Sequence, residues 1–197
     1  MKIVKADDDG LSAAATALLS GGLAIIPTDT VYGLAAHPDF PAAERRLYEA
    51  KRRDPSKPIA FLSSGLSAIE RAAGPLHGEA AALAARFWPG PLTIVAGKEA
   101  FRIPDCEWTR KLLALCGGLL RVTSANISGR PAPVCVDEAA KQLDGLVELA
   151  VDGGRCPGGV ASAVVRPSDD GKIEILRNGG DAALAATLAE KAAQQFE

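Results

Sequence analysis

Short apolar runs of about five residues alternate with longer amphipathic or alanine-rich stretches along the 197-residue chain. A short apolar run bounded by turn residues indicates a buried strand, whereas apolar positions three and four residues apart indicate a helix. The predicted strands span residues 23–27, 58–62, 92–96, 119–123, 147–151, 162–166 and 172–176. The predicted helices span residues 11–20, 41–51, 66–73, 78–87, 107–116, 137–143 and 181–195.

This alternation predicts an α/β fold, in which a twisted sheet is flanked by helices. The strands that cluster near the end of the chain favour a mixed sheet, parallel in part and antiparallel in part. We expect a single domain over residues 1–197, because no linker composition and no internal repeat interrupts the pattern.

Composition and charge narrow the class of protein. Hydrophobic residues make up 48% and charged residues 23% of the chain, with a formal net charge of -2. Proteins that coat nucleic acid nonspecifically are usually strongly basic, so the bulk charge gives no support for that role. No apolar run approaches the ~18 residues that would span a bilayer. Together with the lack of a signal peptide, this predicts a cytoplasmic protein that does not enter the membrane.

The four cysteines are widely spaced, at 106, 116, 135 and 156, and no Cys-x-x-Cys pair occurs. We therefore expect reduced thiols and no zinc site. The P-loop, the dinucleotide fingerprint, the nucleophile elbow and the His-Glu-x-x-His zinc motif are all missing from the sequence. A nucleotide would have to be bound by another route.

Two polar segments directly follow predicted strands, PTDTVYG (27–33) and TSANISGRP (123–131). In an α/β sheet, ligand crevices usually open where strands end, and both segments offer hydroxyl groups there. The same residue types are also typical of turns in which side chains cap backbone groups. Both interpretations stay open on the sequence alone.

A basic segment, KRRDPSKP (51–58), lies at the end of a predicted helix. Its Arg and Lys side chains suit a polyphosphate, because Arg can bind two phosphate oxygens and Lys supplies a point charge. The alternative is a solvated face whose cations interact with the helix dipole. In either case we expect Lys51 and Arg53 to be solvent-accessible. A glycine-rich stretch, 151–166, predicts a tight loop that another chain or a ligand approaches closely. A glycine-rich turn without a function is the open alternative.

Taken in order, the polar segments resemble the YrdC-like family, the threonylcarbamoyl-AMP synthases of tRNA modification. The resemblance covers residues 21–180 and is carried by GGLAIIPTDTVYGLAA, EAKRRDPSKP, FWPGPLTIV, FRIPD, VTSANISGRP, DGG and GVASAVV. It implies a concave, positively lined face on the sheet. It also implies an ATP-dependent nucleotidyltransferase that condenses L-threonine, bicarbonate and ATP to threonylcarbamoyl-AMP and pyrophosphate. A partner transferase complex would then modify tRNA.

The resemblance also implies roles for matched residues. Threonine would be bound by Thr28, Arg102 and Ser162. ATP would be bound by Lys51, Arg53, Lys57, Ser124, Asn126 and Arg177. The implied chemistry needs no covalent nucleophile; Mg²⁺ would accompany ATP, and no residue is assigned as its ligand.

The sequence departs from the family pattern at three places. The segment between LTIV and FRIP is shortened to AGKEA (96–100), alanines flank Ser162, and Arg177 is followed by Asn178. Ala161 and Ala163 predict a looser threonine pocket. Two alternatives therefore remain: a non-catalytic RNA-binding module for tRNA or rRNA, and a paralogue that binds nucleotide without threonine specificity.

Overall fold

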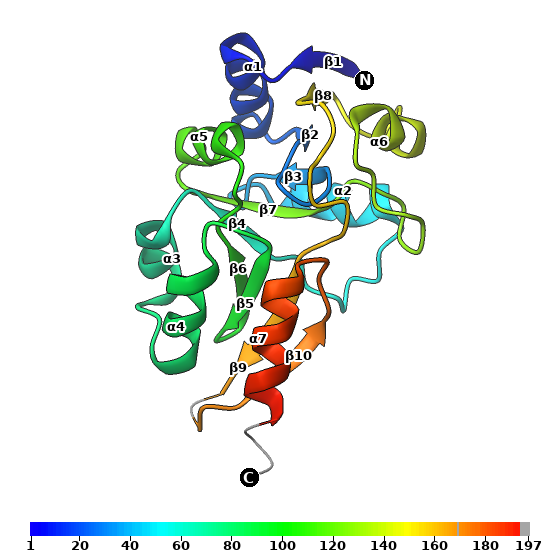
Figure 1. Cartoon of the computed structure of the whole chain (residues 1–197). Helices are drawn as coiled ribbons and strands as arrows, with labels where there is room; N and C mark the ends of the chain where they lie inside the picture. The colour runs from blue at the N-terminus through cyan, green and yellow to red at the C-terminus, as the bar shows by residue number, and fades with distance from the viewer. Residues whose placement is uncertain (169, 194–197) are drawn as a thin grey trace.

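A computed structural model describes residues 1–168 and 170–193 of the chain (Figure 1). Its strands are β1 (Lys2–Lys5), β2 (Leu23–Ile26), β3 (Gly33–Ala36), β4 (Phe61–Ser63), β5 (Leu92–Ala96), β6 (Glu99–Arg102), β7 (Leu119–Ser124), β8 (Leu149–Asp152), β9 (Ala163–Pro167) and β10 (Ile173–Arg177). Its helices are α1 (Asp8–Leu19), α2 (Pro41–Lys51), α3 (Leu66–Ala73), α4 (Gly78–Phe87), α5 (Glu107–Leu115), α6 (Val136–Leu143) and α7 (Ala182–Ala193).

These strands form one continuous sheet in the order β1-β8-β2-β3-β7-β4-β6-β5-β9-β10. The sheet contains both parallel pairs, such as β2 with β8, and antiparallel pairs, such as β2 with β3. The predicted mixed α/β sheet is therefore confirmed. In Figure 1 the sheet runs from β1 at the top of the molecule to β9 and β10 at the bottom, where α7 covers it.

Strand β2 shows how the upper half of the sheet is buried on both faces. Leu23 and Ile25 pack in a cluster with residues of α2 and α6, whereas Ala24 and Ile26 pack in a cluster with residues of α1 and α5. Because side chains alternate along a strand, a run of four apolar residues fills both clusters. For that reason the apolar run at 23–27 correctly predicted a strand that is buried on both faces.

The lower half of the sheet is covered on one face only. On β5, Leu92 and Ile94 pack in a cluster with residues of α4 and α7. The intervening Thr93 and Val95, together with Val164 of β9, line a cavity on the other face. The fold thus leaves one face of β5 and β9 open to a ligand, and that face positions the candidate site.

Three strands of the structure are not among those predicted from the sequence. β1 is a four-residue edge strand that begins and ends with lysine, β3 consists of glycine, alanine and leucine, and β6 contains both Glu99 and Arg102. None of them forms a pure apolar run, so they are formed by pairing with their neighbours in the sheet. The strand predicted at 58–62 begins later, at Phe61.

The helix predictions hold with small shifts. α1 begins at Asp8, earlier than predicted, because the side chain of Asp7 accepts a hydrogen bond from the backbone N–H of Gly10 (2.9 Å). The last two residues predicted for the final helix, 194–195, lie outside the described residues. Among the described residues, no helix has both the length and the apolar character needed to cross a membrane.

Candidate functional site

A cavity of about 770 Å³ opens above β5 and β9 and is bounded by the ends of several strands. In the part of the chain that the structure describes, its lining carries six basic residues and one acidic residue, Glu99. The basic residues are Arg53, Lys57, Lys98, Arg102, Arg166 and Arg177. A cavity of this size is in the range of small-molecule sites, and its charge favours an anionic ligand.

Arg102, the last residue of β6, is held in the cavity wall by three contacts. Its Nε donates to the carbonyl oxygen of Gly90 (2.9 Å), and its two terminal nitrogens donate to Thr30 Oγ1 (2.9 Å) and Asp29 Oδ1 (2.5 Å). Arg102 as a whole residue is only 5% exposed. Three of the five guanidinium N–H donors are thereby engaged, which leaves two for a ligand.

Thr28 combines the two roles that the sequence left open. Its hydroxyl donates to the carbonyl oxygen of Val31 (2.6 Å) and accepts from the backbone N–H of Thr30 (3.1 Å), as in a capped turn. The same residue lines the cavity. The turn therefore fixes the hydroxyl in the wall, next to the residues that hold Arg102.

Ser162 and Arg177 also line the cavity and contact each other. The Ser162 hydroxyl pairs with the hydroxyl of Thr93 (2.8 Å), and Arg177 donates to the carbonyl oxygen (2.9 Å) and hydroxyl (3.2 Å) of Ser162. Burial lowers the pKa of Arg177, and the nearby guanidinium groups of Arg102 and Arg53 lower it further. Arg177 is therefore close enough to Arg102 and Arg53 to be repelled by both, and a bound anion would relieve that repulsion.

The basic turn after α2 contributes two cations to the cavity rim. Arg53 donates to the backbone carbonyl oxygens of Lys57 and Pro58 (3.1 Å each), which fixes its guanidinium across the turn. Lys57 is exposed and lines the cavity. Arg52, by contrast, adopts a left-handed conformation (φ 50°) at the helix C-cap and lies outside the lining.

Lys51 is buried, contrary to the prediction that it is solvent-accessible. Its exposed fraction is 2%, and it is absent from the cavity lining. The ammonium group donates to the carbonyl oxygens of Ser124 and Asn126 (2.6 Å for Asn126) and to Asn126 Oδ1 (3.2 Å). The helix end points this lysine into the loop after β7, where it holds Ser124 in the cavity wall.

Asn126 is likewise turned into its own loop. Its side-chain amide donates to the carbonyl oxygens of Ile127 (3.0 Å) and Arg130 (2.7 Å), while its Oδ1 accepts from Lys51. The structure therefore brings Lys51 and Asn126 into contact with each other. Of the nine predicted site residues, these are the two that do not line the cavity. The other seven all line the cavity.

Burial lowers the pKa of Lys51 to about 8, with Arg53 as a second cause. Since the unfolded chain binds this proton up to a higher pH than the folded protein, this group makes folding more favourable as pH rises above about 8. At neutral pH the ammonium stays charged.

The glycine-rich stretch packs against the turn that holds Arg102. Backbone N–H groups of Gly158 and Gly159 donate to the carbonyl oxygens of Asp29 (3.0 Å) and Thr30 (2.9 Å). A Cβ at Gly158 would lie 2.7 Å from that Asp29 oxygen, so only glycine permits the approach. A close approach does occur at this stretch, with residues 29–30 of the same chain as the approached segment.

The two alanines beside Ser162 have different surroundings. Ala161 lines the cavity, whereas Ala163 is 2% exposed and packs in the cluster with residues of α4 and α7. The expectation that both positions loosen the threonine pocket is wrong for Ala163, because side chains alternate across β9. Of the two alanines, only Ala161 can affect the shape of the cavity.

The family resemblance assigns no role to Asp29, Thr30 or Thr93, although all three contact assigned residues. Asp29 and Thr30 stand in the PTDTVYG segment, but their partner Arg102 is about 70 residues away, and no local pattern pairs them. Thr93 interrupts the apolar run LTIVA, and a polar residue within a buried strand was the one signal for it.

No group of three or more His, Cys, Asp or Glu side chains is arranged to hold a metal ion within residues 1–168 and 170–193. The carboxylates near the cavity are also engaged: Asp29 by Arg102 and Glu99 by Arg121 (2.6 and 2.8 Å). Mg²⁺ is usually held by one or two carboxylates plus substrate phosphates. The residues present therefore do not form a magnesium site of their own.

Comparison with known proteins places these features in a family context. The Sua5/YciO/YrdC family, described as "Telomere recombination", matches residues 16–179. A threonylcarbamoyl-AMP synthase of Bacillus subtilis is 35% identical over 189 residues, covering 88% of this chain and 54% of the relative. A putative threonylcarbamoyl-AMP synthase of Methanocaldococcus jannaschii is 34% identical, and the match covers 82% of each chain.

Solved structures agree with this similarity. The crystal structure of Pyrococcus abyssi Sua5 complexed with L-threonine superposes with a TM-score of 0.87 at 30% identity, over 97% of this chain and 62% of that one. Escherichia coli YciO shares the fold, with a TM-score of 0.78 at 20% identity. The chain spans about half the length of the Bacillus and Pyrococcus synthases that it matches.

The buried position of Lys51 makes a prediction about stability. Lys51→Met should lower the free energy of unfolding by about 2 kcal/mol or more, because the buried carbonyl and side-chain oxygens of Asn126 lose their donor. Lys57→Met removes an exposed ammonium from the same basic segment and should change it by less than about 0.5 kcal/mol. Chemical denaturation of both variants measures the difference, and equal stabilities would contradict the structural role of Lys51.

Proposed function

We propose that this chain, which belongs to the Sua5/YciO/YrdC family, condenses L-threonine, bicarbonate and ATP to threonylcarbamoyl-AMP and pyrophosphate. The observation that carries the proposal is the convergence of Arg53, Arg102 and Arg177 with Ser162 on one cavity. The reactants carry a carboxylate, a carbamate and a triphosphate, so a cavity that concentrates cations suits them. The names of the relatives support the same activity.

Threonine would bind at the Arg102 end of the cavity. The two free N–H donors of Arg102 can receive the substrate carboxylate, and Asp29 keeps the guanidinium in place. The paired hydroxyls of Ser162 and Thr93 can bind the threonine hydroxyl or the carbamate. Thr28 also lines the cavity and contacts Thr30, the partner of Arg102.

ATP would occupy the remaining cavity, with its phosphates near the rim cations. The carbamate oxygen attacks the α-phosphorus, a bond forms between them, and the bond to the β-phosphate oxygen breaks. Arg53, Lys57 and Arg177 would neutralise the charge that accumulates in this reaction between anions. Ser124 would contact the nucleotide, and Lys51 and Asn126 would act by holding the Ser124 loop. No covalent nucleophile is required.

Magnesium would enter this scheme as the counter-ion of ATP. Because the nearby carboxylates are engaged by arginines, the ion would be held by phosphate oxygens and water instead of by protein ligands. The cavity residues provide the remaining neutralisation.

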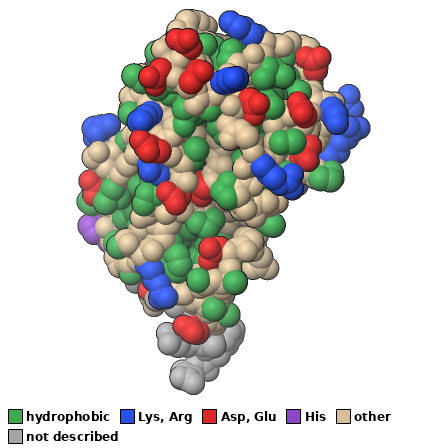
Figure 2. Space-filling model, turned by 45° about the horizontal axis from the view of Figure 1, so that its top comes forward, with side chains coloured by type: hydrophobic (Ala, Val, Ile, Leu, Met, Phe, Trp, Pro, Cys, Tyr) green, Lys and Arg blue, Asp and Glu red, His purple; other side chains and the backbone are tan. Residues whose placement is uncertain are grey.

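The product would be passed to a partner transferase complex that modifies tRNA in the cytoplasm. The four cysteines, free of disulfides in the described chain, are in keeping with a reducing compartment. Figure 2 shows Lys and Arg side chains interspersed with Asp and Glu over the face turned to the viewer. On this face neither sign is in excess, so it lacks the single-sign charge of a nonspecific RNA-binding surface.

The reaction itself provides the first test of this proposal. Pyrophosphate release from ATP should require both threonine and bicarbonate, because neither alone supplies the carbamate. Serine lacks the methyl group, whose loss from a fitted pocket costs roughly 1–3 kcal/mol. With Ala161 in the lining, we expect discrimination near the lower end of that range. Pyrophosphate release that ignores threonine would favour the paralogue without threonine specificity.

Arg102 should determine the affinity for threonine. Arg102→Lys keeps the charge but loses the planar fork, so the KM for threonine should rise about tenfold or more, with a smaller rise in the KM for ATP. Arg110→Lys, at an arginine outside the cavity lining, is the matched control. If both KM values rise together in Arg102→Lys, the guanidinium is structural or binds the nucleotide.

Arg53 should contribute to ATP affinity. Arg53→Ala removes a charge-assisted phosphate contact and should weaken ATP binding by about 1.5–3 kcal/mol in a titration. The adjacent Arg52→Ala is the control, because Arg52 lies outside the cavity lining. Equal affinities of the two variants for ATP would remove Arg53 from the site.

A further inference from the structure

The turn between β5 and β6 places on the cavity rim a lysine, Lys98, to which neither the sequence motifs nor the family resemblance gives a role. Ala96 pairs with Glu99, so Gly97 and Lys98 form a two-residue hairpin turn. Gly97 takes a positive φ of 62° at the first turn position, as a tight hairpin requires. The shortened segment between the two strands therefore fixes the backbone of Lys98 directly at the cavity.

A clamp formed by Arg121 holds this hairpin against the basic turn. Arg121 donates to both carboxylate oxygens of Glu99 (2.6 and 2.8 Å) and also to the carbonyl oxygen of Ile59 (2.7 Å). Its guanidinium lies over the ring of Phe61, 3.7 Å from the centroid. Residues 97–99 are thereby tied to the segment that follows Lys57, which brings Lys98 to the same rim as Lys57.

The charge of Lys98 is available to a ligand. The one carboxylate of the described cavity lining, Glu99, is neutralised by Arg121. Arg166, another rim cation, is paired with Glu174 (2.7 Å). Lys98 is exposed and makes no hydrogen bond or ion pair with the residues that the structure describes.

Distance along β6 indicates which part of a substrate would reach Lys98. Arg102 stands four residues further along the chain, about 13 Å away at 3.3 Å per residue of strand. In the in-line arrangement, about nine covalent bonds of roughly 1.5 Å separate the threonine carboxylate carbon from the γ-phosphorus, and bond angles reduce their fully extended span to about 11 Å. With the carboxylate on Arg102, the distal phosphates would therefore lie near Lys98.

We propose that Lys98, together with Lys57, forms a subsite for the β- and γ-phosphates of ATP and for the pyrophosphate released from them. This inference rests on the proposed function. When the bond between the α-phosphorus and the bridging oxygen breaks, its electron pair stays on pyrophosphate. The two ammonium groups neutralise the charge that this leaving group gains.

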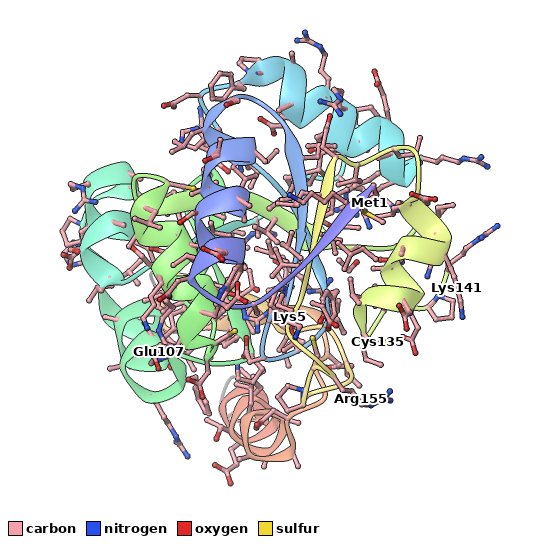
Figure 3. All side chains as sticks on the ribbon, turned by 90° about the horizontal axis from the view of Figure 1, so that it is seen from above. Met1, Lys5, Glu107, Cys135, Lys141 and Arg155 are labelled. Carbon is pink, nitrogen blue, oxygen red and sulfur yellow. The ribbon has the colours of Figure 1, made fainter. Side chains whose placement is uncertain are left out.

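Binding of pyrophosphate and AMP to the full chain tests the subsite separately from turnover. Lys98→Ala should weaken pyrophosphate and ATP binding about five- to tenfold, while AMP affinity changes less than twofold, because AMP lacks the distal phosphates. Lys98→Arg keeps the charge and should retain most of the affinity. The control is Lys141→Ala, on α6, whose side chain points outward in Figure 3 and is absent from the lining.

Each outcome decides a different part of the proposal. Unchanged pyrophosphate affinity in Lys98→Ala, or an equal loss of AMP affinity, would overturn the subsite while leaving the proposed function intact. Wild-type protein that binds neither ATP nor pyrophosphate would overturn both. Wild-type protein that binds ATP without threonine-dependent turnover would overturn the proposed function alone, and the affinities of Lys98→Ala would still decide the subsite.

Discussion

The contact between Arg102 and the turn at 28–30 joins the two halves of the sheet, and the geometry of the cavity depends on it. Arg102 belongs to the half in which one face of the sheet is open, whereas Asp29 and Thr30 follow β2 in the half that is buried on both faces. Because Arg102 and Thr30 are buried and Asp29 is partly buried, the hydrogen bonds have little competition from water, and loss of one partner would leave the other uncompensated. The glycine-rich stretch adds two backbone hydrogen bonds to the same turn. One network therefore fixes the wall where we place threonine.

The cations of the segment 51–57 are neighbours in sequence, but they differ in burial and in what they contact. Within the segment 51–57, Lys51 is buried and holds the Ser124 loop, Arg52 is turned to solvent, and Arg53 and Lys57 line the cavity. A helix end followed by a left-handed residue produces this division, because each side chain leaves the backbone in a different direction. Loss of activity in a Lys51 variant is thus not by itself evidence for a phosphate contact. Stability has to be measured first.

Local patterns were enough to predict the class of fold, whereas the site residues came from the family resemblance. Apolar runs located most of the strands, and seven of the nine residues to which the resemblance gives a role line the cavity. What could not be predicted depends on contacts between distant segments. β3 and β6 are strands because of their neighbours, the burial of Lys51 depends on a loop more than 70 residues away, and Ala163 faces the core through the alternation of β9. The subsite at Lys98 needed the Arg121 clamp, which no sequence motif marks.

The most direct test of the account is the structure of the protein in complex with L-threonine and a non-hydrolysable ATP analogue. We expect the threonine carboxylate to lie within hydrogen-bond distance of Arg102 and the phosphates to lie against Arg53 and Lys57. Lys51 should remain bonded to the Ser124–Asn126 loop, without contact to the nucleotide. Threonine bound away from Arg102, or phosphates bound outside the cavity, would contradict the account.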